Sequence, residues 1–170
     1  MINVSEIETS KVEILLRKFL CGRMVSDVGI YLRSMIRIDI DESIDPISNE
    51  SKNVQQIGRS SIGIRDAKWK FAMDHKEIFS SDDISEVTES KSLVGRLIGA
   101  EVKDIDVSEC ISFHFSSGIT ISAPCNNVYD SEMDLIDIRL NSRNSIIFTA
   151  ECVWLLEDDQ ETDRGRDAHC

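Results

Sequence analysis

Residues 16–30 read LRKFLCGRMVSDVGI, and residues 93–107, which lie 77 positions later, read LVGRLIGAEVKDIDV. In both segments, apolar residues at helical spacing lead to a glycine, and apolar residues at alternate positions follow it. This pattern predicts a helix that ends at the glycine, followed by a strand. The matching positions are Leu16, Leu20, Gly22, Val25, Asp27, Val28 and Ile30, which fall on Leu93, Leu97, Gly99, Val102, Asp104, Ile105 and Val107.

A second set of matches extends this repeat at a larger offset. Ser60, Ile62, Ala67, Trp69 and Phe71 fall on Ser145, Ile147, Cys152, Trp154 and Leu156. We therefore expect one structural unit used twice, over about residues 12–79 and 89–156, with about eight additional residues in the second copy. Because indole rings bury a large area, we expect both tryptophans to anchor the core.

Alternating apolar residues predict a hairpin after each first strand. In the second copy, alternation over residues 111–115 and 119–121 flanks a turn at residues 116–118. In the first copy, residues 36–40 alternate, and the polar segment 41–56 replaces the tight turn.

The expected fold class is α+β and mainly antiparallel β, with two pseudo-repeated helix-strand-hairpin halves in one compact domain. A helix is expected over residues 4–20, single long strands over 61–71 and 145–156, and a further strand over 134–140. The domain should cover residues 1–156, and the polar residues 157–170 should form an acidic flexible tail.

Composition predicts a globular cytoplasmic protein. The chain has 170 residues, of which 41% are hydrophobic, so a single domain with a substantial core is expected. No apolar run reaches the length of a membrane span, and Glu6, Glu8 and Glu13 lie where a secretory signal would be apolar. The five cysteines are widely spaced and include no CxxC pair, which favours reduced thiols.

The net charge of -12 is unevenly distributed. Residues 1–80 contain twelve basic and twelve acidic residues, whereas residues 81–170 contain seven basic and nineteen acidic residues. A negative field of this kind repels nucleic acid and anionic membranes and attracts basic proteins. We therefore expect a protein partner, with no nucleic acid and no membrane.

One cluster of chemically versatile residues is predicted in the second copy. Cys110, Ser112 and His114 share a strand face, and Asp104 and Asp106 share the matching face of the preceding strand. The cluster lacks a glycine-rich oxyanion loop and the paired spacing of zinc ligands. The chain also lacks the phosphate-binding and metalloenzyme motifs, so we expect no enzyme activity, cofactor or metal. A small enzyme or metal-binding protein centred on Asp104, Asp106, Cys110 and His114 remains the alternative.

The second copy also carries the pattern Leu97-x-Gly99-x-x-Val102, followed by Phe113-x-Phe115-x-x-Gly118. Over about half of the chain, this resembles small bacterial proteins that are similar to immunity proteins of contact-dependent inhibition and other polymorphic toxin systems. The resemblance implies a cytosolic protein that binds and neutralises a cognate toxin. Such toxins are often nucleases with basic catalytic domains, which an acidic inhibitor would suit. The residues expected to bind this partner are Asp104, Asp106, His114, Asp130, Glu132, Asp134 and Asp137.

Overall fold

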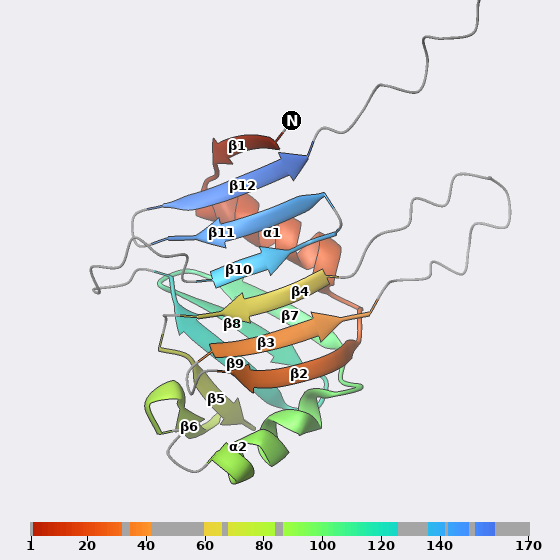
Figure 1. Cartoon of the computed structure of the whole chain (residues 1–170), viewed down its shortest axis with the longest axis vertical. Coiled ribbons are helices and arrows are strands. Elements are labelled where there is room, and N and C mark those ends of the chain that lie inside the picture. Colours follow the sequence, from red (N-terminus) through yellow and green to blue (C-terminus); the bar gives the residue numbers. More distant parts are fainter. Residues whose placement is uncertain are drawn as a thin grey trace, which may run out of the picture.

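The computed structural model describes residues 2–31, 35–41, 60–65, 68–83, 87–125, 136–141, 143–149 and 152–158. These residues form two α-helices, two short 3-10 helices and twelve strands arranged in two sheets (Figure 1). Every pair of neighbouring strands is antiparallel. The expectation of a mainly antiparallel β protein with a few helices is therefore confirmed.

The larger sheet has seven strands, which we call the large sheet, and the other has five, which we call the small sheet. In spatial order, the large sheet consists of β1 (Ile2–Glu6), β12 (Val153–Asp158), β11 (Asn144–Phe148), β10 (Ile136–Arg139), β4 (Ser60–Ile64), β3 (Met35–Ile40) and β2 (Val25–Tyr31). The small sheet consists of β6 (Lys76–Ser80), β5 (Lys70–Met73), β9 (Ile119–Pro124), β8 (Cys110–Phe115) and β7 (Val102–Val107).

Alternation along the strands builds one core between the sheets. Inward-facing isoleucines of the large sheet pack against aromatic and aliphatic side chains of the small sheet, and these side chains are buried from solvent. The helix α1 (Thr9–Leu20) lies behind the large sheet in Figure 1, and Val12, Leu16 and Leu20 on one of its faces join the same core.

A glycine with positive φ follows each helix. Gly22 comes after α1 with φ +84°, and Gly99 comes after α2 (Val87–Val94) and its 3-10 extension (Gly95–Leu97) with φ +82°. A side chain at either position would be strained in this left-handed conformation, which explains why both helices end in glycine. The sequence-based prediction of these two helix ends is confirmed.

The segments that begin at these glycines, residues 22–25 and 99–102, make reciprocal hydrogen bonds to each other. Gly22 N–H donates to the Val102 carbonyl at 2.9 Å, and Gly99 N–H donates to the Val25 carbonyl at 2.8 Å. Val25 N–H donates to the carbonyl of the residue after Gly99, and Val102 N–H donates to the carbonyl of the residue after Gly22, each at 2.9 Å. When residues are matched at the first offset of the sequence repeat, 77 positions, each of these bonds corresponds to the reciprocal bond in the other segment.

The first strand of each segment is irregular at the same place. The register of β2 shifts between Val25 and Asp27, and that of β7 shifts between Val102 and Asp104. In both strands, the aspartate accepts a hydrogen bond from the next backbone N–H, at 2.8 Å and 2.9 Å respectively.

The spatial order of the strands is equivalent in the two sheets, except that the large sheet has two additional strands. The order β2-β3-β4-β10-β11 parallels β7-β8-β9-β5-β6, and β12 and β1 lengthen the large sheet only. This order aligns β4 with β9, whereas the larger offset of the sequence repeat aligns β4 with β11.

Several expected boundaries are wrong. The helix expected over residues 4–20 begins at Thr9, because residues Ile2–Glu6 pair with β12 as a strand. The long strands expected over 61–71 and 145–156 are each divided in two, and β6 was not predicted. Glu157 and Asp158 belong to β12, so any tail begins later; residues 159–170, and all of the segment 41–56 except its first residue, lie outside the described residues.

The two tryptophans differ. Trp69 is completely buried, as expected. Trp154 is partly exposed, because Val153 and Leu155 occupy the core-facing positions of β12 and Trp154 therefore lies on the outer face. The expectation that Trp154 anchors the core is wrong.

Neither described helix has the length and hydropathy of a membrane span. The described cysteines, at positions 21, 110, 125 and 152, are free thiols as predicted.

Candidate functional site

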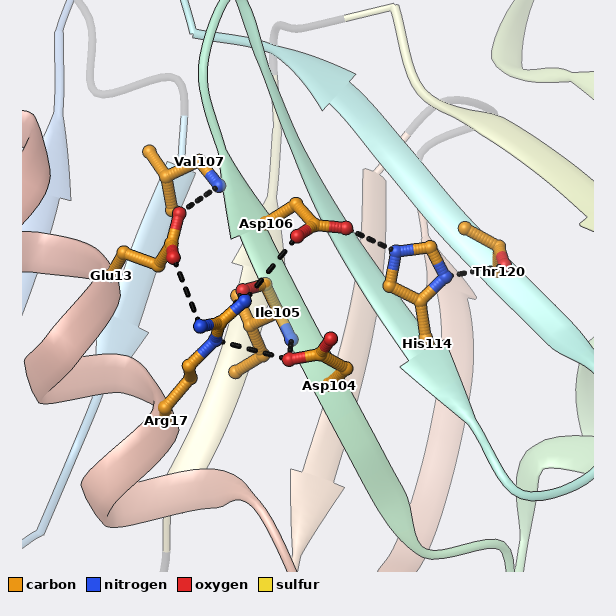
Figure 2. Close-up of polar contacts among 8 residues, drawn as sticks. All are labelled: Glu13, Arg17, Asp104, Ile105, Asp106, Val107, His114 and Thr120. Carbon is orange, nitrogen blue, oxygen red and sulfur yellow. Dashed lines mark hydrogen bonds and ion pairs between the residues drawn. The ribbon is translucent and has the colours of Figure 1, made fainter.

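Two side chains of α1 hydrogen-bond to the free edge of β7. The Glu13 carboxylate accepts from Val107 N–H at 3.0 Å, and Arg17 Nε donates to the Ile105 carbonyl at 3.0 Å (Figure 2). Because β7 is an end strand of the small sheet, no other described strand pairs with these backbone groups. Glu13 and Arg17 therefore satisfy backbone N–H and C=O groups of β7 that would otherwise be available to pair with another strand.

The same guanidinium holds three carboxylates. Arg17 lies 3.2 Å from Glu13, 3.0 Å from Asp104 and 3.4 Å from Asp106, measured between nitrogen and carboxylate oxygen. The side chains of Asp104 and Asp106 are 54% and 57% exposed, and that of Arg17 is 42% exposed. Three carboxylates against one guanidinium leave an excess of negative charge on this surface, which is partly screened by water.

Asp106 also joins this cluster to β8 and β9. Its second carboxylate oxygen lies 2.8 Å from His114 Nε2, and His114 Nδ1 lies 3.1 Å from the Thr120 hydroxyl (Figure 2). Asp104 is paired with His114 in the strand register. The prediction that Asp104, Asp106 and His114 come together is confirmed. A carboxylate, an imidazole and a hydroxyl in this order are also the groups that nucleophilic catalysis uses.

Cys110 lies apart from these groups, so the expectation that its thiol joins them is wrong. It begins β8, four residues before His114, and its strand partner is Pro124. Among the described residues, the hydrogen bonds and ion pairs of Asp104, Asp106 and His114 do not include it. Within the same residues, no three histidine, cysteine or acidic side chains are placed to hold a metal ion.

Burial keeps two other thiols protonated. Burial raises the pKa of the Cys125 thiol to about 12, and the nearby Cys110 adds to the shift. Burial also raises the pKa of the Cys21 thiol, with a further contribution from the negative charge of Asp104. Thiols with raised pKa values are poor nucleophiles at neutral pH.

Of the remaining expected partner-binding residues, the structure describes Asp137, which does not join the cluster. Asp137 lies on β10 of the large sheet, where its carboxylate is 4.0 Å from the Arg65 guanidinium. Asp130, Glu132 and Asp134 lie outside the described residues. The cluster on the small sheet therefore consists of Glu13, Arg17, Asp104, Asp106 and His114, and we call it the α1–β7 cluster.

Sequence reasoning missed Glu13 and Arg17. They are four residues apart with the acid first, the favourable order for a pair on a helix surface. That spacing could have indicated a helical ion pair. The spacing does not indicate that the pair would contact carboxylates almost ninety residues away in the sequence.

No known protein family, curated protein or solved structure matches the chain.

Proposed function

We propose that this protein is a cytoplasmic immunity protein that binds and neutralises a cognate toxin with a basic catalytic domain. The observation that carries the proposal is the α1–β7 cluster, in which one guanidinium and two backbone N–H groups hold three carboxylates in place, and the two of them on β7 are about half-exposed. Side chains that are ordered before binding lose less conformational entropy on association. Their excess negative charge would accelerate encounter with a basic surface.

Inhibition would follow from competition for the cationic groups of the toxin. A nuclease binds a polyanion, so its cleft presents arginine and lysine side chains. Asp104 and Asp106 would pair with such cations, and His114 would extend the polar contact across β8. Asp130, Glu132, Asp134 and Asp137 would contribute further carboxylates from the second half of the chain.

Binding kinetics of the toxin encoded beside this protein test the proposal. The double variant Asp104→Asn/Asp106→Asn should lower the association rate about tenfold in low salt, because removing charge chiefly slows encounter. A matched control is Glu77→Gln on β6, which removes one half-exposed carboxylate that is paired with Lys70. Equal association rates for both variants would place the interface elsewhere.

We also propose that the two halves, over about residues 12–79 and 89–156, are pseudo-repeats related by a twofold axis. The reciprocal bonds of Gly22 and Gly99, the shared irregularity of β2 and β7, and the parallel strand orders support this. The strand β1, which precedes the first half, and the strand β12, which begins inside the second half, would then have no counterparts in the small sheet.

A second candidate is a small enzyme centred on Asp104, Asp106, Cys110 and His114. The chain from Asp106 through His114 to Thr120 favours it, since histidine could accept the hydroxyl proton. Hydrolysis of an activated ester that is lost in His114→Ala would support this candidate, as would one equivalent of metal by elemental analysis. A metal-free protein with hydrolysis at the background rate would contradict it.

A further inference from the structure

Four strands end the two sheets, and three of them are protected against pairing with another strand. Glu13 and Arg17 cover β7, and α2 with its 3-10 extension lies beside β2 (Figure 1). The third, β6, begins with Lys76 and pairs with β5 across an irregular register. Lysine, irregular pairing and covering elements are the usual means of blocking an edge.

Among the described residues, neither a lysine, an irregular register nor a covering element protects the fourth end strand, β1. Residues Ile2–Glu6 pair with β12 in continuous register and contain neither lysine nor proline. In the described residues, β12 is the only strand that pairs with β1, which lies at the upper end of the large sheet in Figure 1.

The hydrogen-bonding pattern identifies which groups of β1 face outward. Ile7 N–H donates to the Val153 carbonyl at 3.0 Å, so this is a hydrogen-bonded pair of the antiparallel ladder. Such pairs recur at every second residue, which directs the backbone groups of Ser5 toward β12. The N–H and C=O groups of Val4 and Glu6 therefore point to the free edge.

Side chains on the outer face make this edge apolar in the middle and acidic at one end. Val4 is 58% exposed and lies opposite Leu156, and Glu6 lies opposite Trp154. Ile147 continues the row beyond Trp154. Glu6 makes no ion pair with any described residue.

We propose that β1 is a docking edge at which an extended segment of the toxin adds as an eighth strand. On the outer face, this segment would place an apolar side chain beside Val4 and Leu156 and a lysine or arginine beside Glu6. Backbone hydrogen bonds would supply affinity, and the alternating side chains would supply specificity. The identity of the partner rests on the proposed immunity function.

Charge favours this partner over a second copy of the chain. Antiparallel pairing of two β1 strands about Val4 would place each Glu6 opposite Ile2 and leave both carboxylates without a cation. Two chains of net charge -12 also repel each other. A basic segment would neutralise Glu6 instead.

A partner that contacts both the docking edge and the α1–β7 cluster would have to extend along α1. The twelve residues of α1 follow β1 almost directly, and a helix of that length spans about 18 Å.

The test uses the full-length protein and a synthetic seven-residue peptide that alternates valine and lysine, so it does not depend on the toxin. On peptide addition, the amide protons of Val4 and Glu6 should gain at least tenfold protection from hydrogen exchange. A peptide that alternates valine and glutamate is the matched control and should give no protection. Equal protection by both peptides, or no protection of these two amides by the basic peptide, would overturn the docking edge.

Proline substitution at Val4 sharpens the test. Val4→Pro removes an N–H that points outward and leaves the ladder to β12 intact, since proline is tolerated at such edge positions. It should abolish peptide binding, whereas Val4→Thr should bind within threefold of the wild type. Unchanged peptide binding by Val4→Pro would contradict the inference.

Two further outcomes separate the hypotheses. Protection of the Val4 and Glu6 amides that rises with protein concentration, without peptide, would make a second copy the occupant and overturn the assignment. Neutralisation of the toxin without protection of these amides in the complex would contradict the docking edge and leave the immunity function standing.

Discussion

Replacement of Arg17 by alanine is expected to destabilise the protein by about 2 kcal/mol. Three partly exposed ion pairs contribute about 0.5 kcal/mol each, which is the middle of the range for such pairs. The bond from Arg17 Nε to the Ile105 carbonyl adds about 0.5–1 kcal/mol once its exposure is considered. For a chain of this size, the melting temperature should fall by about 4–8 °C.

Thermal and urea unfolding of matched variants measure this effect. Lys11→Ala is the control, since it removes a cation from the same helix whose nearest carboxylate, on Glu8, is 3.7 Å away and 75% exposed. It should cost less than about 0.5 kcal/mol. Arg17→Lys should fall between the two, because lysine keeps the charge but cannot bond to several groups at fixed angles. The difference between wild type and Arg17→Ala should also narrow in 1 M salt.

Equal destabilisation by Arg17→Ala and Lys11→Ala would refute this reasoning. The α1–β7 cluster would then be a set of contacts without energetic weight. Its carboxylates would not be held in place before a partner binds.

Three further predictions concern other parts of the molecule. Gly22→Ala and Gly99→Ala should each cost about 1 kcal/mol by urea unfolding, because both glycines have positive φ; costs that differ by more than twofold would count against equivalent halves. Alkylation at pH 8, followed by peptide mass mapping, should modify the exposed Cys110 before the other described cysteines and leave Cys125 unmodified in the native state. The reason is that pH 8 is far below the raised pKa of Cys125, about 12, so its thiolate is scarce; rapid native modification of Cys125 would contradict this. Arg23→Ala should lower the free energy of unfolding by about 3 kcal/mol, because this buried guanidinium donates to two backbone carbonyls and the Ser60 hydroxyl, and a cost below 1 kcal/mol would refute its structural role.

The local alternation of apolar and polar residues was sufficient to predict much of the small sheet. The alternation through β7 and β8 placed Asp104, Asp106 and His114 on one face, and the structure joins Asp106 to His114 directly. A period of two fixes which side chains share a face, and a short turn fixes which strands are neighbours. For these reasons, sequence alone was a good guide to this part of the site.

Other features depend on contacts between distant residues. Val4 and Ile7 fit a helical spacing, yet pairing with β12 makes a strand of residues Ile2–Glu6. The sequence around Trp154 is apolar at successive positions, so it could not show which residues face the core. Arg17 reaches Asp106 across almost ninety residues, and no local pattern encodes that distance.

Cell growth under co-expression tests the proposed immunity function most directly. The catalytic domain of the toxin encoded beside this protein would be expressed with and without it, and the complex examined by gel filtration at low and high salt. We predict that growth is restored and that a complex survives gel filtration at low salt and weakens as salt is raised. Persistent toxicity together with no complex at low salt would contradict the proposal.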